Sequence, residues 1–125
     1  MAESTRSTAY LCGRLWAAVH ALRVLSGQPD PGKLAEGGGL HDAQRYPERE
    51  LNRQLGRLGD RLRAAHARGA EHARAAAAVF RSIPDHVPPG GRLPPGLYPE
   101  AQKEFLLGFR AGLDLYETEH GDLLR

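Results

Sequence analysis

Arginine is the residue type in this chain whose spacing most clearly suggests a chemistry. Five arginines recur at intervals of four residues: Arg45, Arg49, Arg53, Arg57 and Arg61. The guanidinium group is always charged, and its planar fork matches the oxygens of a phosphate. Four leucines follow helical spacing in the same segment: Leu51, Leu55, Leu58 and Leu62. A helix with one apolar side and a strongly basic flank is therefore predicted, and such a flank suits a phosphate backbone.

The arginines do not all lie on one side of that helix. At 100° per residue the leucines and Ala65 share an arc, and Arg49 and Arg53 lie opposite it. A four-residue repeat drifts by about 40° per step, so Arg57 and Arg61 move toward the edge of the arc. The charge winds around the helix, which suits a groove-like partner. The candidate nucleic-acid-binding residues are Arg49, Arg53, Arg57 and Arg61, with Arg45, Arg63 and Arg68 as a second group.

A solvated helix face is the alternative explanation of this charge. Acidic residues stand within one helical turn of several arginines, and such neighbours pair readily. The candidate pairs are Glu50 with Arg53, and Asp60 with Arg57 or Arg63. Only one aromatic residue, Tyr46, is interleaved with the arginines. If nucleic acid binds here, contact with the phosphate backbone is expected rather than stacking on bases.

Charge is unevenly distributed along the 125 residues, although the net charge is only +2. Residues 45–81 carry nine arginines against four acids, a net charge of +5, whereas residues 100–125 carry six acids against three bases, a net charge of −3. The surface is therefore expected to be polarised, or to belong to pieces of one assembly that meet head to tail. The length predicts a single domain over residues 1–125.

The remaining reactive residue types do not form a catalytic or metal-binding pattern. His66 and His72 are six residues apart, which is not the spacing of a helical metal pair, and the other four histidines are scattered. Cys12 is the single cysteine, and we expect it to be a small residue of the hydrophobic core. We expect no enzymatic activity, no cofactor and no metal. The lone cysteine, with no leader sequence and no apolar run long enough for a membrane span, predicts a soluble cytoplasmic protein.

Helix formers dominate and β-branched residues are few, so the predicted fold is all-α. We expect a small bundle of about four helices with two long Gly/Pro-rich loops. Serine or threonine caps, glycine stops and first-turn prolines set the boundaries. The predicted helices cover residues 7–26, 47–68, 70–82 and 98–118, and the loops cover residues 27–40 and 84–95. The alternative to a break at Gly69 is one long kinked rod formed by the second and third helices.

Two further features of the predicted helices concern packing. Gly108 and Gly112 fall inside the last helix, where each costs up to about 1 kcal/mol against alanine. A close helix crossing explains them, and Gly13 in the first helix is the natural partner. The inward residues predicted for the third helix are Ala73, Ala76, Ala77, Phe80 and Ile83.

Two segments contain specific residue combinations that an ordinary amphipathic helix does not require. The first runs from Tyr10 through Gly13-Arg14-Leu15 to Trp16, and the second combines Ile83-Pro84 with the residues from Gln102 to Phe109. Together they resemble the C-terminal helical region of the large subunit of type I-C CRISPR surveillance complexes (Cascade). After Phe109 the family usually continues with aromatic and glutamine residues, whereas here Arg110-Ala111-Gly112 follow, and the loop at 88–95 is longer than usual. A closely related type I system is the other option.

The resemblance implies a structural role. In that family the region is also made separately, by internal translation, as the small subunit, and a chain that begins at Met1 just before this region fits such a product. Small subunits have no nuclease activity. They occur in more than one copy, line the complex beside the backbone subunits that hold the guide RNA, and stabilise the R-loop by giving the displaced DNA strand a basic path. The expected partners are therefore the backbone and large subunits, further copies of the chain and the guide RNA–DNA complex, but no membrane.

Two rivals remain open. A stand-alone nucleic-acid-binding protein would bind DNA by itself, with an affinity that falls steeply with salt. A protein-interaction adaptor would assemble with partners and ignore DNA, leaving its arginines solvated.

Overall fold

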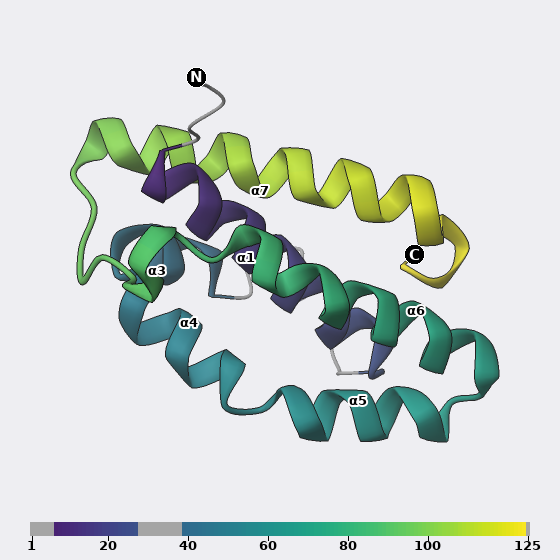
Figure 1. Cartoon of the computed structure of the whole chain (residues 1–125). Helices are drawn as coiled ribbons and strands as arrows, with labels where there is room; N and C mark the ends of the chain where they lie inside the picture. Colours follow the sequence, from purple (N-terminus) through teal and green to yellow (C-terminus); the bar gives the residue numbers. More distant parts are fainter. Residues whose placement is uncertain (1–6, 28–38, 125) are drawn as a thin grey trace.

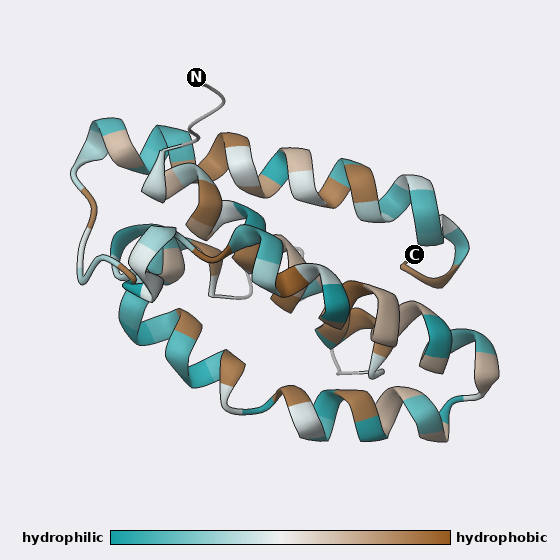
Figure 2. Ribbon diagram, viewed as in Figure 1, coloured by the Kyte–Doolittle hydropathy of each residue, from teal (hydrophilic) through white to brown (hydrophobic). Residues whose placement is uncertain are grey.

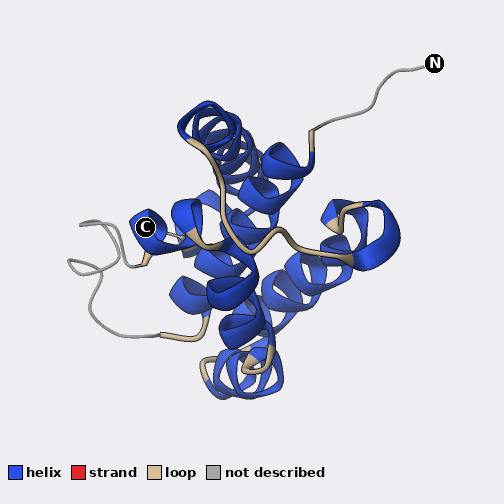
Figure 3. Ribbon diagram, turned by 90° about the vertical axis from the view of Figure 1, so that its left-hand side faces the viewer, coloured by secondary structure: helices blue, strands red, loops and turns tan. Residues whose placement is uncertain are grey.

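The computed structural model describes residues 7–27 and 39–124, and these residues form helices, turns and loops without a strand (Figures 1 and 3). Six α-helices lie in the described part of the chain: α1 (Thr8–Leu25), α3 (Leu40–Arg45), α4 (Pro47–Leu55), α5 (Leu58–Ala67), α6 (Ala70–Ser82) and α7 (Pro99–His120). Three 3₁₀ turns accompany them: η1 (Ile83–His86), η2 (Pro89–Gly91) and η3 (Gly121–Leu123). The all-α prediction is confirmed. No helix among these residues is both long and apolar enough to cross a membrane.

Helix α1 is the centre of the fold. The side-chain oxygen of Ser7 accepts a hydrogen bond from the Tyr10 backbone nitrogen (3.0 Å) and caps its first turn. Gly27 follows its end with a φ of +80°, a conformation that favours glycine. Most of its side chains are buried, including Trp16, and it contacts each of the other α-helices described. The predicted boundaries and core role of this helix are confirmed.

Glycines bring α1 and α7 into backbone contact. A Cβ atom added to Gly13 would overlap the carbonyl oxygen of Phe105, and one added to Gly108 would overlap the carbonyl oxygen of Tyr10. A Cβ on Gly112 would stand 2.6 Å from the Cβ of Ala17. The helix crossing predicted from these glycines is confirmed, and it places α7 along α1 (Figure 1).

The single helix predicted over residues 47–68 is wrong. Helix α4 ends at Leu55 and the backbone leaves helical geometry at Arg57, so residues 56 and 57 separate α4 from α5. Two glycines, Gly56 and Gly59, lie close together here, and each lowers helix stability by up to about 1 kcal/mol relative to alanine. The break does not disturb the leucine arc, because Leu51 and Leu58 are both buried on either side of it.

A short helix, α3, precedes the predicted one. It ends at Arg45 because Tyr46 stands before Pro47, and a residue before proline is disfavoured in helical geometry. Pro47 occupies the first turn of α4, as predicted. The predicted loop over residues 27–40 lies mainly in 28–38, outside the described residues.

The boundaries of α6 match the prediction, and three of the five predicted inward residues, Ala73, Ala76 and Ile83, are buried. Phe80 is 41% exposed, contrary to the expectation that it faces the core. Val79 and Ala75 are buried instead, because the buried stripe lies about one residue earlier along the helix.

The apolar side of α4 is narrow, and Figure 2 shows this helix as mainly hydrophilic. The basic residues are therefore carried by the least apolar helices of the fold.

Candidate nucleic-acid interface

The candidate arginines follow α3, α4 and α5 in order, along one edge of the molecule (Figure 1). Arg45 ends α3, Arg57 stands in the break between α4 and α5, and Arg68 follows the end of α5. The others lie within the helices: Arg49 and Arg53 on α4, Arg61 and Arg63 on α5. Six of the seven are exposed, and Arg61 is half-buried. The edge presents guanidinium groups over three short helices rather than one long rod.

Tyr46 organises the first two arginines. The guanidinium carbon of Arg49 lies 4.7 Å from the centre of the Tyr46 ring, and that of Arg45 lies 5.5 Å from it. Guanidinium groups at this distance are attracted by the aromatic face. Both charges are thereby held at the junction of α3 and α4 while the groups stay open to solvent.

Glu50 organises the next pair. Its carboxylate accepts a hydrogen bond from Arg49 Nε (2.7 Å) and another from Arg53 Nη1 (3.2 Å). The glutamate side chain is only 6% exposed, whereas the two arginine side chains are 56% and 57% exposed. The predicted Glu50–Arg53 pair is confirmed, and one acid partly neutralises two candidate residues. Each arginine still presents most of its side chain to solvent.

Replacing Glu50 by glutamine is expected to change stability and binding in opposite directions. Removing the carboxylate deletes two charge-assisted hydrogen bonds, which lowers the free energy of unfolding by about 1 kcal/mol. Nucleic-acid binding becomes tighter, and its dependence on salt steepens by about one unit in the log–log slope, because one counter-charge is lost. Urea denaturation and salt-titrated binding measure the two effects.

Glu48→Gln is the matched control, because Glu48 lies on the same helix and is exposed. It makes the same change in charge without removing a buried carboxylate, so it should lower stability less, by only the few tenths of a kcal/mol that an exposed first-turn acid contributes. Equal stability of the two variants would contradict the organising role of Glu50.

On α5 the positive charges are crowded. Burial lowers the pKa of Arg61 from its usual value, Arg57 lowers it further, and Asp60 opposes the shift. The pKa of Arg23 on α1 is lowered by burial and then by Arg61. An anion close to these groups would reduce their mutual repulsion. The predicted pair of Asp60 with Arg63 is present at 3.3 Å, but both side chains are highly exposed, so it contributes little to stability.

Arg68 has a structural task. Its Nη1 donates hydrogen bonds to the carbonyl oxygens of Val24 (3.0 Å) and Leu25 (3.1 Å) at the end of α1. A cation at a helix C-terminus satisfies terminal carbonyls and interacts favourably with the helix dipole. The sequence placed Arg68 with the phosphate-binding candidates, whereas the fold uses its guanidinium to join α5 to α1.

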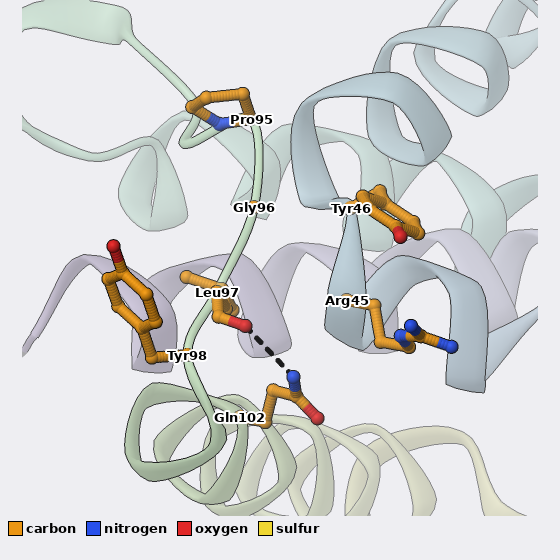
Figure 4. A pocket seen from close by; sticks show the side chains of 7 residues that line it. All are labelled: Arg45, Tyr46, Pro95, Gly96, Leu97, Tyr98 and Gln102. Carbon is orange, nitrogen blue, oxygen red and sulfur yellow. Dashed lines mark hydrogen bonds between the residues drawn. The ribbon is translucent and has the colours of Figure 1, made fainter.

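A groove next to the basic edge was not foreseen from the sequence. It has a volume of about 430 Å³ and is lined by Arg45, Tyr46, Pro95, Gly96, Leu97, Tyr98 and Gln102 (Figure 4). Tyr98 stands 52 positions after Tyr46 in the chain, so spacing along one helix gives no sign that both line one groove. The only local signal is the Tyr98-Pro99 pair at the start of α7.

The reactive side chains elsewhere are engaged in packing. Cys12 is fully buried, and burial raises the pKa of its thiol to about 12, so the thiolate is scarce at neutral pH. The Tyr116 hydroxyl lies 2.6 Å from Ser82 Oγ and 3.4 Å from His86 Nε2, joining α7 to α6 and η1. Burial lowers the pKa of His86, Arg14 lowers it further and Asp85 opposes the shift. In residues 7–27 and 39–124 no three His, Cys, Asp or Glu side chains gather as a metal site.

Comparison with known protein families, curated proteins and solved structures gives no match to this chain. The described residues define a small all-helical protein with an arginine-rich edge. Its functional assignment therefore rests on its own residues and their arrangement.

Proposed function

We propose that this chain is a non-catalytic small subunit of a type I CRISPR RNA-guided surveillance complex, of subtype I-C or a close relative. It packs along the backbone and large subunits, in more than one copy, and binds DNA through the basic edge formed by α3, α4 and α5. The arginine array is the observation that carries the proposal.

The two segments that resemble the type I-C large subunit support the proposal by their contact. Gly13 belongs to the first segment and Gly108 to the second, and each packs its Cα against the backbone of the other helix. These segments are far apart in the chain, yet they meet at the α1–α7 crossing. The glycines in these two segments then have a physical reason, because a side chain at either position would push the two helices apart.

The basic edge supports binding to a phosphate backbone without regard to sequence. Contacts between arginine and phosphate position a nucleic acid but read no bases. In guided systems, base pairing selects the target, and the exchange of one duplex for another is nearly balanced in free energy. A basic path for the displaced strand would tip this exchange toward the R-loop, which needs no catalytic residue.

The outer face of α7 supports contact with protein neighbours. Leu107 is 53% exposed and Leu115 is 41% exposed on this helix. The same helix carries most of the acids of the chain's C-terminal part, including Glu104 and Asp114. An exposed face that combines apolar and acidic side chains suits a basic surface on a neighbouring subunit.

Co-purification tests the proposal. The tagged chain is expressed with the other subunits and guide RNA of its cognate complex, while internal initiation in the large-subunit gene is silenced. Retention at moderate salt in two or more copies, weighed by native mass spectrometry, is the expected result. A complex that assembles normally without the chain would overturn the proposal. DNA binding by the chain alone would then favour a stand-alone binder, and its absence an adaptor.

A further inference from the structure

The groove beside Tyr98 is a built feature of the fold. The segment 94–97 is fastened to α3 and α4 by two backbone hydrogen bonds, from Leu97 N to Arg45 O (3.1 Å) and from Glu48 N to Pro94 O (3.0 Å). Gln102 Nε2 donates to Leu97 O (2.8 Å), which ties the same segment to α7 (Figure 4). Two parts of the chain that are distant in sequence, residues 45–48 and residues 94–102, therefore hold the groove in one shape.

Tyr98 stands at the mouth of this groove with 86% of its surface exposed. Its backbone is extended, as the following Pro99 requires, and its carbonyl accepts a hydrogen bond from Gln102 N (2.9 Å). An aromatic ring held so far out of the core contributes little to folding, because most of its apolar surface stays in water. The backbone of Tyr98 is therefore fixed, and the faces of its ring are available to a ligand.

The wall across the groove is cationic. Tyr46 and Arg45 lie on one side of the segment 95–98 and Tyr98 lies on the other (Figure 4). Arg45 lines the groove, and the guanidinium group of Arg49 lies over the Tyr46 ring that lines it, so one positive charge borders the groove and a second is close by. Aromatic rings beside a basic path are the combination that binds single-stranded nucleic acid.

The geometry points to a base-stacking site for single-stranded nucleic acid. An unpaired base stacks on the Tyr98 ring, while the adjoining phosphates contact Arg45 and Arg49. This inference rests on the proposed DNA-binding function and deepens it, because it adds stacking of the bases of the displaced strand to contact with its phosphates. A proline-rich peptide is the other ligand that aromatic grooves accept, but the guanidinium groups at this groove favour a polyanion.

Two labelled oligomers of equal charge test the inference with the full chain. One is oligo-deoxythymidine of about 12 nucleotides, and the other is the same sugar–phosphate chain without bases. We expect the wild type to bind the thymidine oligomer about tenfold more tightly than the abasic one in a fluorescence-anisotropy titration. Tyr98→Ala should abolish this difference and leave the abasic affinity unchanged. Because Tyr98 is exposed, the substitution should preserve the fold.

Leu115→Ala is the matched control, because it removes an exposed apolar side chain near the other end of α7. It should retain the full preference for bases. Equal binding of both oligomers by the wild type, or a preference that survives Tyr98→Ala, would overturn the stacking site while leaving phosphate binding intact. Failure of the chain to bind either oligomer would also overturn the stacking site, whereas the subunit role is decided separately by the co-purification test. Binding of a proline-rich peptide that depends on Tyr98, without a preference for bases, would reassign the groove to a peptide.

Discussion

Replacing Gly108 by alanine is expected to lower the free energy of unfolding by about 3 kcal/mol or more. The new methyl group would overlap the carbonyl oxygen of Tyr10 and lie 2.9 Å from its carbonyl carbon. Both atoms belong to the backbone of α1, so no side-chain rotation relieves the overlap. The two helices must move apart, and a loss of this size is a large part of the total stability of a small domain.

Gly59→Ala provides the matched control. Gly59 lies inside α5, and a Cβ added there would have no atom within 4 Å. The same methyl group should therefore raise stability, by up to about 1 kcal/mol, because alanine favours the helix more than glycine. Urea denaturation followed by the fluorescence of the buried Trp16 measures both variants. If Gly108→Ala is as stable as Gly59→Ala, the α1–α7 crossing is not as close as described.

Helix ends were predictable where one residue decides them. Ser7 caps α1, Gly27 ends it, Gly69 separates α5 from α6 and Pro99 begins α7, all as the sequence indicated. Each of these depends on local backbone chemistry. The close crossing of α1 and α7 was also predictable, because glycine inside a helix has a cost that only close packing explains.

The break between α4 and α5 was not predictable from periodicity. The leucines on both sides remain on the core side, so the apolar pattern runs through Gly56 and Arg57 without interruption. The prediction that Phe80 faces the core was wrong for a related reason. The alanine-rich α6 has several similar apolar faces, and packing against α1 buries the face with Ala76 and Val79. Periodicity identifies an amphipathic segment better than it fixes its length or exact rotation.

The candidate site was also predictable only in part. The arginines and their neighbours on one helix were visible in the sequence, and two of the predicted ion pairs are present. The burial of Glu50, the use of Arg68 at the end of α1 and the presence of Tyr98 beside Tyr46 depend on contacts between elements. Spacing along one helix carries no information about such contacts.

Those contacts decide which arginines make the cleanest test of DNA binding. Arg49 and Arg53 satisfy a buried carboxylate, and Arg68 holds two backbone carbonyls, so replacing any of them would disturb the fold. Arg57 and Arg63 are exposed and have no such task. Arg45 is exposed and stacks on one face of Tyr46. The test therefore replaces Arg45, Arg57 and Arg63.

The triple change of these arginines to glutamine is expected to weaken DNA binding by the assembled complex by at least about tenfold, equally for all sequences. Each lost phosphate contact should also reduce the slope of log affinity against log salt by about 1, so the triple variant should lose about 3. Helix content and assembly should stay unchanged, because none of the three side chains is buried. Salt-titrated R-loop formation measures the effect.

The control carries the same change in charge on other surfaces, with Arg74, Arg81 and Arg110 replaced by glutamine. These arginines are exposed and lie on α6 and α7, outside the α3–α5 edge. If DNA follows the basic edge, the control should keep nearly all of the salt slope, because counterion release depends on phosphates in contact with the protein. If both triple variants lose affinity and slope equally, only the net charge of the subunit matters. In that case the arginine edge is not the surface that binds the displaced strand.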